Sequence, residues 1–312
     1  MGTPVQCLCR RRIPHCVPVR QAEAEHRGCR VIFSAPTCVL GSSNLWPKVT
    51  PGHDPEKHVE IGSLTKVITG TALMRMSAAG MVSPADPVEK WLPAAPGTGI
   101  TLQHLASHTA GLPRVPPGLR SGFNDPWRDF TDQALRDLLA RLDQLITGPP
   151  GEHGKYSNLG YAILGAALSS AAGAGFEELA HEHVLAPLGV PPGAMTARPS
   201  GETRLLSRSR FRYRSKPWTL DGAVLPAAGM WASCTTVGRL ITGVLIDRTL
   251  GAPAPTWHAA GPLLWHNGAT RRSSIFTGAF ADGEWIVMHR LSGAPQRTDR
   301  MALAELRAAR AV

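Results

Sequence analysis

The chain has 312 residues, of which 43% are hydrophobic and 18% charged, and it carries a formal net charge of +10. This composition is ordinary for a folded globular protein and excludes disorder over the whole length. No apolar run reaches the roughly 18 residues that a membrane-spanning helix needs, so we expect no membrane partner. The basic residues are spread along the chain without a nucleic-acid-binding motif, so we expect no nucleic-acid partner either.

Residues 1–50 form an atypical segment whose structure the sequence predicts poorly. Five of the six cysteines lie there. The spacing of Cys7, Cys9 and Cys16 does not match a zinc site, and a disulfide framework is unusual in a chain of this size, so we expect free thiols. The arginines at 10–12 are not followed by the apolar stretch of a secretory signal, which favours a cytoplasmic protein. Two short strands are expected in this segment, at 31–33 and 38–40.

A helical pattern begins at residue 63. Residues 63–80 are apolar nearly all round, which predicts a buried central helix. Short helices are predicted at 87–92 and 102–108, and an amphipathic helix capped by Thr131 runs to residue 146. After a Pro-Gly turn, further helices are predicted at 158–172, 176–188 and 237–245.

Strands are predicted mainly in the last third of the chain. They cover residues 263–268, 273–280 and 284–291, and an alternating basic pattern suggests another at 205–216. Helices in the middle and strands late predict an α+β fold, in which an antiparallel β-sheet is flanked by helices and carries an inserted all-helical subdomain.

The predicted layout is a catalytic domain at residues 51–312 that follows the atypical segment. Its helical region covers about 80–200 and its sheet lies mainly at 205–295, with a C-terminal helix at 300–311. The N-terminal part departs from this pattern, and no internal repeat is present.

Ser63 and Lys66 are the first candidate catalytic residues, in the segment GSLTK at 62–66. Residues three apart share one face of a helix, so the hydroxyl and the amine would be neighbours. A serine hydroxyl needs a base, and a buried lysine with a lowered pKa can be that base. The pair alone is a weak signal, because a capping serine and a surface lysine occur at this spacing by chance.

Tyr156 and Asn158 precede and open the helix predicted at 158–172. A phenol beside a lysine can pass a proton to a leaving group. The Asn158 side chain offers both a donor and an acceptor to an amide-bearing substrate. Taken alone, a turn tyrosine and a helix-capping asparagine have an ordinary structural explanation.

The segment His266-Asn267-Gly268-Ala269 supplies a third feature, on a predicted strand. A glycine within a strand lets a ligand approach the backbone closely. The backbone N–H of Ala269 would then join that of Ser63 in an oxyanion hole. A lone histidine such as His266 is more usually an ordinary, partly buried residue.

Together and in this order, these features resemble the motifs Ser-x-x-Lys, Tyr-x-Asn and Lys/His-x-Gly of the serine β-lactamase and penicillin-binding-protein superfamily. The flanking residues are similar to the branch that holds class C β-lactamases, D-alanyl-D-alanine carboxypeptidases and esterases. The similar segments are EIGSLTK at 60–66, LASHTAGLP at 105–113, YSNLGY at 156–161 and AAGMWAS at 227–233.

The resemblance implies that Ser63 attacks a carbonyl group and forms an acyl-enzyme, while Lys66 and Tyr156 carry its proton to the leaving group. The substrate would be a small ester or amide, including D-amino-acid peptides and β-lactams, and no metal or organic cofactor is implied. A neutral imidazole at 266 favours an esterase or peptidase over an efficient β-lactamase. The residues implied in substrate or oxyanion binding are Asn158, His266, Asn267, Gly268 and Ala269.

Other interpretations stay open beside this one, as do the exact substrate, the acyl acceptor and the oligomeric state. A catalytically impaired relative would bind a ligand without turning it over. The basic strip at 208–216 would bind nucleic acid, although a solvated strand face explains it more simply. His108 would serve a Ser–His triad, but no orienting carboxylate is evident in the sequence.

Overall fold

The computed structural model describes residues 35–119, 125–207 and 216–310, which belong to one compact unit that begins at Ala35. Its main element is a six-stranded sheet with the order β2-β1-β9-β8-β7-β6, in which every neighbouring pair is antiparallel. The strands are β1 (Thr37–Gly41), β2 (Lys48–Val49), β6 (His258–Ala260), β7 (Leu263–Ala269), β8 (Ser274–Phe280) and β9 (Trp285–Arg290). The predicted α+β fold with an antiparallel sheet is confirmed.

The sheet starts earlier in the chain than the predicted boundary at residue 50. β1 contains the strand expected at 38–40, and it pairs along its whole length with β9, so that Cys38 lies opposite His289. Long-range pairing of this kind leaves no local signal in the sequence, so the strand was expected but its pairing with β9 was not. The strand expected at 31–33, Cys7, Cys9 and Cys16 lie outside the described residues.

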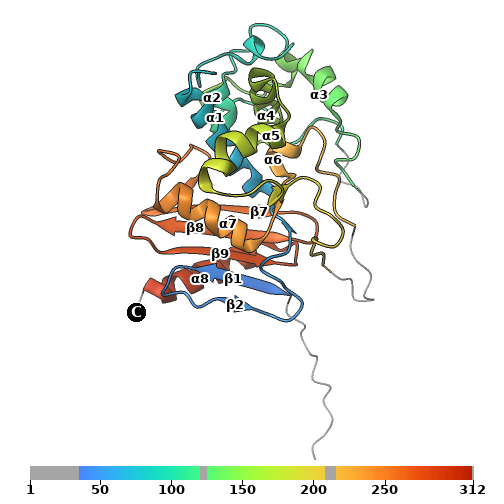
Figure 1. Ribbon diagram of the computed structural model, residues 1–312. Helices are drawn as coiled ribbons and strands as arrows, with labels where there is room; N and C mark the ends of the chain where they lie inside the picture. Colours follow the sequence, from blue (N-terminus) through green and yellow to red (C-terminus); the bar gives the residue numbers. More distant parts are fainter. Residues whose placement is uncertain (1–34, 120–124, 208–215, 311–312) are drawn as a thin grey trace, which may run out of the picture. The chain divides into compact units, whose positions relative to one another are not determined.

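Each face of the sheet is covered by helices, as alternation along the strands requires. On one face, α8 (Pro295–Arg310) packs through Leu306 against Phe276 and Met288. On the other, the neighbouring residues Ile275 and Val287 join the larger core with α7 (Cys234–Ile241). Figure 1 shows α7 crossing the sheet, while α1 to α6 gather beyond its β7 side.

The helical region is built around α1 (Thr65–Ala78), which follows the 3₁₀ turn η1 (Gly62–Leu64). Most of α1 is buried, as its apolar pattern predicted. The remaining helices are η2 (Val88–Lys90), α2 (Leu102–Ala106), α3 (Asp132–Leu139), η3 (Leu142–Leu145), α4 (Asn158–Ala172), α5 (Phe176–Ala180), η4 (His181–Leu185), η5 (Ala186–Leu188), α6 (Leu225–Ala228) and η6 (Thr242–Ile246). A small antiparallel sheet has the order β3 (Val59–Glu60), β5 (Trp231–Ala232) and β4 (Met195–Thr196), and β3 leads directly toward η1.

Several helix boundaries follow from side-chain caps. Thr131 and Ser157 accept backbone N–H bonds at the starts of α3 and α4, where the sequence predicted those helices to begin. α2 ends at Ala106 rather than 108, because His108 takes a left-handed conformation with φ of 60°. The strand suggested at 205–216 is absent from residues 205–207 and 216, and 208–215 lie outside the described residues.

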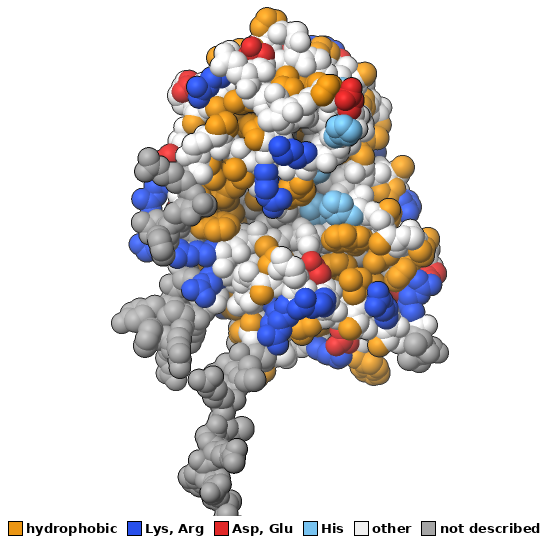
Figure 2. Space-filling model, turned by 180° about the vertical axis from the view of Figure 1, so that it is seen from behind, with side chains coloured by type: hydrophobic (Ala, Val, Ile, Leu, Met, Phe, Trp, Pro, Cys, Tyr) orange, Lys and Arg blue, Asp and Glu red, His pale blue; other side chains and the backbone are white. Residues whose placement is uncertain are grey.

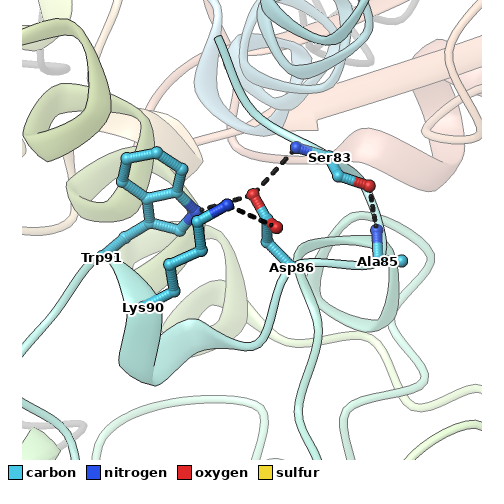
Figure 3. A network of polar contacts seen from close by, with 5 residues as sticks. All are labelled: Ser83, Ala85, Asp86, Lys90 and Trp91. Atoms are coloured by element: carbon cyan, nitrogen blue, oxygen red, sulfur yellow. Dashed lines mark hydrogen bonds and ion pairs between the residues drawn. The ribbon is translucent and has the colours of Figure 1, made fainter. Parts of the chain in front are cut away.

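The loop between α1 and α2 is fixed by the carboxylate of Asp86 (Figure 3). It accepts hydrogen bonds from the Ser83 backbone N–H, the Lys90 ammonium and the Trp91 indole N–H, at 2.9, 2.8 and 3.1 Å. One acidic side chain thereby joins the two ends of the turn that leads into η2.

Among the described helices, no single one is both long and apolar enough to cross a bilayer. α4 and the segment Phe176–Leu188 reach that length and composition only as a pair bent by 84°. α4 lies largely in the protein core.

Candidate active site

Ser63 is positioned by a turn that packs backbone to backbone against β7. Gly62 has φ of +51°, and a Cβ built on it would lie 2.7 Å from the backbone N of Ala269. A Cβ on Gly268 would lie 1.9 Å from the carbonyl oxygen of Ile61. Only glycines permit this approach, which brings the backbone of Ala269 beside the turn that carries Ser63.

Lys66 follows Ser63 by one helical turn, and its side chain is completely buried. Its Nζ lies 3.3 Å from Ser63 Oγ, 2.7 Å from Asn158 Oδ1 and 2.7 Å from the carbonyl oxygen of Ala227. None of these partners is a carboxylate. Burial therefore lowers the pKa of Lys66, although the nearby Tyr156 hydroxyl partly opposes the shift.

The acceptors around Lys66 fit an ammonium and also a neutral amine. The oxygens of Asn158 and Ala227 can only accept, so they take two N–H bonds from Nζ. A neutral amine has two such donors and one lone pair, and this lone pair is left for the Ser63 hydroxyl. An ammonium would instead donate its third N–H to Ser63 Oγ.

Tyr156 completes the group by donating a hydrogen bond of 2.6 Å from its phenol to Ser63 Oγ. The Lys66 Nζ and the Arg114 guanidinium lie 4.7 and 4.9 Å from the centroid of its ring. The ring also packs against His108, with 4.5 Å between the ring centroids. The phenol is thus held between packed side chains while its oxygen contacts Ser63 Oγ.

His108 supports the tyrosine turn and does not complete a Ser–His triad. Its Nδ1 accepts the Ser157 backbone N–H at 3.1 Å, and its carbonyl oxygen accepts the Lys155 N–H at 2.7 Å. Nδ1 is where a triad histidine meets its orienting carboxylate, and here a backbone amide occupies it. Burial lowers the pKa of His108 to about 3, so the imidazole is neutral at physiological pH.

The strand residues predicted to bind substrate divide between the two faces of β7. His266 is buried on the same side as Lys66, with its ring stacked on His258 at 5.2 Å. The Asn267 side chain donates at 2.8 Å to Asp299 of α8, on the opposite face. Asn267 was predicted among the substrate or oxyanion residues, but strand alternation directs its side chain away from Ser63.

His266 carries its proton on a defined nitrogen. Nδ1 donates to the carbonyl oxygen of Asn267 at 2.6 Å, and the buried Nε2 has no partner among the described residues. Burial, reinforced by the charge of Lys66, lowers the pKa of His266 to about 3. The side chain therefore offers an acceptor rather than a positive charge.

Ser63 is in contact with solvent, whereas the Lys66 amine is not. Ser63, Tyr156, Asn158 and Ala269 are each partly exposed, while Lys66 is sealed beneath them. Figure 2 shows basic and histidine side chains lying close together near the middle of one face of the molecule. A carbonyl compound can approach Ser63 from solvent while the lysine stays dry.

A family model described as Beta-lactamase matches residues 44–291, which is most of the chain. The chain belongs to the β-lactamase family. This membership supports a hydrolase activity of the serine type in general.

Known members of the β-lactamase family give more specific similarities. The D-alanyl-D-alanine-carboxypeptidase/endopeptidase AmpH of Escherichia coli K12 is 35% identical over 161 residues, which are 49% of this chain and 40% of AmpH. Penicillin-binding protein 4* of Bacillus subtilis is 29% identical over 42% of this chain and 29% of its own length. The chain therefore matches less than half the length of these relatives.

Solved structures agree on the fold of this β-lactamase-family chain. A β-lactamase/D-alanine carboxypeptidase from Pseudomonas syringae superposes with a TM-score of 0.69 at 16% identity, covering 88% of this chain and 93% of its own. One from Yersinia pestis, complexed with citrate, gives 0.67 at 21% identity, covering 85% and 89%. At these identities the likeness concerns the fold alone.

Sequence reasoning from the β-lactamase-family motifs missed three groups of the site. Arg114 directly follows the segment at 105–113, and nothing in that pattern showed that its side chain would lie over Tyr156. The carbonyl oxygen of Ala227 is a backbone group that any residue type supplies. Tyr161 donates to the Ala106 carbonyl oxygen at 2.7 Å, and its ring centroid lies 5.4 Å from Lys66 Nζ.

Proposed function

We propose that this protein is a serine hydrolase or acyltransferase that forms an acyl-enzyme on Ser63 with small ester or amide substrates, including D-amino-acid peptides or β-lactams. One observation carries the proposal: Ser63 Oγ lies within hydrogen-bond distance of both a buried lysine amine and a phenol, at 3.3 and 2.6 Å. A hydroxyl with a base on one side and an acid on the other is equipped for nucleophilic catalysis.

Acylation follows from these positions. Ser63 Oγ forms a bond to the substrate carbonyl carbon as its proton passes to the lone pair of Lys66. The carbonyl oxygen becomes an oxyanion that the backbone N–H groups of Ser63 and Ala269 stabilise. The bond to the leaving group then breaks, the Tyr156 phenol protonates that group, and the Lys66 ammonium returns a proton to the phenolate.

Deacylation uses the same groups in reverse. Water, or an acceptor alcohol or amine, attacks the acyl carbon while Tyr156 and Lys66 remove its proton. The ester bond to Ser63 breaks, and Oγ recovers a proton. Because both half-reactions need the same groups, the acyl acceptor decides between hydrolysis and transfer.

The charges near the site favour a substrate whose carboxylate is bound by Arg114 rather than by His266. His266 is neutral and offers only an acceptor, so it would bind a carboxylate poorly. Arg114 is exposed beside Tyr156 and carries a permanent positive charge. A free peptide C-terminus would pair with it, in keeping with the carboxypeptidase named among the relatives.

The test is covalent labelling followed by intact-mass measurement. The protein is treated with a fluorophosphonate and then with p-nitrophenyl esters, D-amino-acid amides and β-lactams. We expect one adduct per chain in the unchanged protein and in Ser77→Ala, which alters a serine of α1, the helix that follows η1, and none in Ser63→Ala. Failure to label, or equal labelling of Ser63→Ala, would defeat the proposal, and ligand binding without any adduct would favour a catalytically impaired relative.

A further inference from the structure

Two cysteines and a histidine from distant parts of the chain meet where the sheet contacts α7. Cys38 lies in β1, Cys234 is the first residue of α7, and His53 lies in the turn after β2. One ligating atom from each lies within 4.8 Å of the other two. Both cysteines are free thiols with no solvent exposure. The proposed reaction at Ser63 uses none of these groups.

A chain of hydrogen bonds fixes which nitrogen of His53 is free. The Ser273 hydroxyl donates to the Glu60 carbonyl oxygen at 2.7 Å, because a carbonyl can only accept. Ser273 Oγ must then accept the Nε2–H of His289 at 2.6 Å. This leaves His289 Nδ1 as an acceptor, and it takes the Nε2–H of His53 at 2.7 Å.

The outcome is an imidazole lone pair with no donor to satisfy it. His53 Nδ1 carries no proton when the ring is neutral, its accessible area is nearly zero, and it has no hydrogen-bond partner among the described residues. A buried polar atom of this kind needs an explanation, such as an ion. Histidines that bind metals commonly donate their second ring N–H to a fixed acceptor, as His53 does to His289.

We propose that Cys38, Cys234 and His53 Nδ1 bind a zinc ion. Thiolate and imidazole ligands suit zinc, with metal–sulfur distances of about 2.3 Å and metal–nitrogen distances of about 2.0 Å. Ligand atoms within 4.8 Å of each other need only small side-chain rotations to reach such an arrangement. Each thiol releases its proton as the metal–sulfur bond forms, so binding weakens as pH falls.

The bound ion would tie three separate segments together. It would join strand β1, the turn at residue 53 and the start of α7. Through His289 and Ser273, hydrogen bonds would extend this connection to the backbone of Glu60, three residues before Ser63. A disulfide between Cys38 and Cys234 would also join β1 to α7. It would leave the lone pair of His53 without a role, and we therefore favour the metal.

The experiment uses the full chain with Cys7, Cys9, Cys16 and Cys29 changed to serine, so that only Cys38 and Cys234 remain. The reduced, chelator-treated protein is titrated with Co²⁺ as a spectroscopic substitute for zinc. We expect one cobalt per chain, with thiolate-to-cobalt charge-transfer absorption that Zn²⁺ abolishes. Cys38→Ser and Cys234→Ser should lose this absorption, and His53→Gln should weaken binding at least tenfold.

His58→Gln is the matched control, because His58 is a neighbouring histidine bonded to the Gly193 carbonyl oxygen, and it should bind cobalt unchanged. Since single variants can fail to fold, the melting temperature of the quadruple-serine protein is measured as well. It should rise with Zn²⁺ and not with Mg²⁺. If both thiols are shown to be reduced, the absence of charge-transfer absorption and of a shift in melting temperature would overturn the proposal. A Cys38–Cys234 disulfide whose reduced form binds no cobalt would also overturn it.

Discussion

Tyr156 donates a hydrogen bond of 2.6 Å to the Oγ of Ser63, although 93 residues separate them in the chain. The contact exists because α4 and α1 pack together in the helical region, and the turn before α4 is closed over the start of α1. It brings the proposed nucleophile together with a phenol that no local pattern connects to it. The expected behaviour of the site follows from this pairing and from the burial of Lys66.

Replacing Tyr156 by phenylalanine should slow amide acylation more than ester acylation. The change keeps the ring contacts with His108 and Lys66 but removes the proton that a leaving amine needs. General-acid contributions are about 10²–10⁴-fold. We expect a loss of that size with D-amino-acid amides and a much smaller one with p-nitrophenyl esters, whose leaving group departs without protonation. Single-turnover acylation rates measure both, and equal losses would contradict the assigned role.

Replacing Asn158 by aspartate should move the pH dependence of acylation. In the proposed reaction the unprotonated amine of Lys66 is the base, so kcat/KM should rise with pH through the lowered pKa of Lys66. A carboxylate at 158 would sit 2.7 Å from Nζ and stabilise the ammonium. It would raise the pKa of Lys66, so the rise of kcat/KM would occur at higher pH. His108 and His266 have pKa values of about 3 and do not titrate in this range.

Asn158→Ala is the comparison for this shift, since it removes the acceptor without adding charge. The rise of kcat/KM should then occur near its original pH or at lower pH. If the pH at which kcat/KM rises moved equally in the aspartate and alanine variants, it would reflect the pKa of a group other than Lys66.

Adding a methyl group at Gly268 should impair catalysis by moving the oxyanion strand. The new Cβ would collide with the Ile61 carbonyl oxygen and displace β7 from the turn that carries Ser63. Loss of an oxyanion donor costs about 10²–10³-fold. We expect Gly268→Ala to lose at least a hundredfold in acylation rate. Gly154→Ala, whose Cβ would meet open space, should retain the rate, and a fully active Gly268→Ala would argue against an oxyanion role for this strand.

Changing Glu60 to glutamine should stabilise the protein at alkaline pH. Burial raises the pKa of Glu60 to about 7, from 4.5. The folded state then holds a proton that the unfolded state has already lost, so stability falls as pH rises from 4.5 to 7. One pKa unit is worth about 1.4 kcal/mol, so the free energy of unfolding at pH 8 should rise by about 1–3 kcal/mol.

Urea unfolding at pH 5 and pH 8 measures this difference. The gain from Glu60→Gln should be small at pH 5, where the folded carboxyl is already neutral. Glu202→Gln, which changes an exposed carboxylate, is the control. An equal gain at both pH values would mean that Glu60 does not change its charge on folding between them.

The sequence predicted the features that depend on neighbours close in the chain. The start of α4 after Ser157 and the start of α3 after Thr131 rest on bonds between residues three apart. The placement of Ser63 and Lys66 on one helix face likewise needs only helical geometry. Three strands near the C-terminus were found because alternation and a tight turn are local signals.

Features that depend on packing between distant segments required the tertiary structure. A strand was expected at 38–40, but its pairing with β9, at the other end of the chain, was not predicted. Asn267 was assigned to the site, whereas its strand places the side chain beside Asp299. Arg114 reaches Tyr156 from a loop with no periodic pattern, so no motif identified it.

The sequence by itself therefore determined which chemical groups are present and, over one helical turn, how they are spaced. Only the tertiary structure decided that the Lys66 amine is buried without a counter-charge, that the phenol of Tyr156 reaches Ser63, and that Cys38 and Cys234 face one another beside His53. The reason is that desolvation and contact depend on what surrounds a side chain. Those surroundings come from elements that long-range packing brings together.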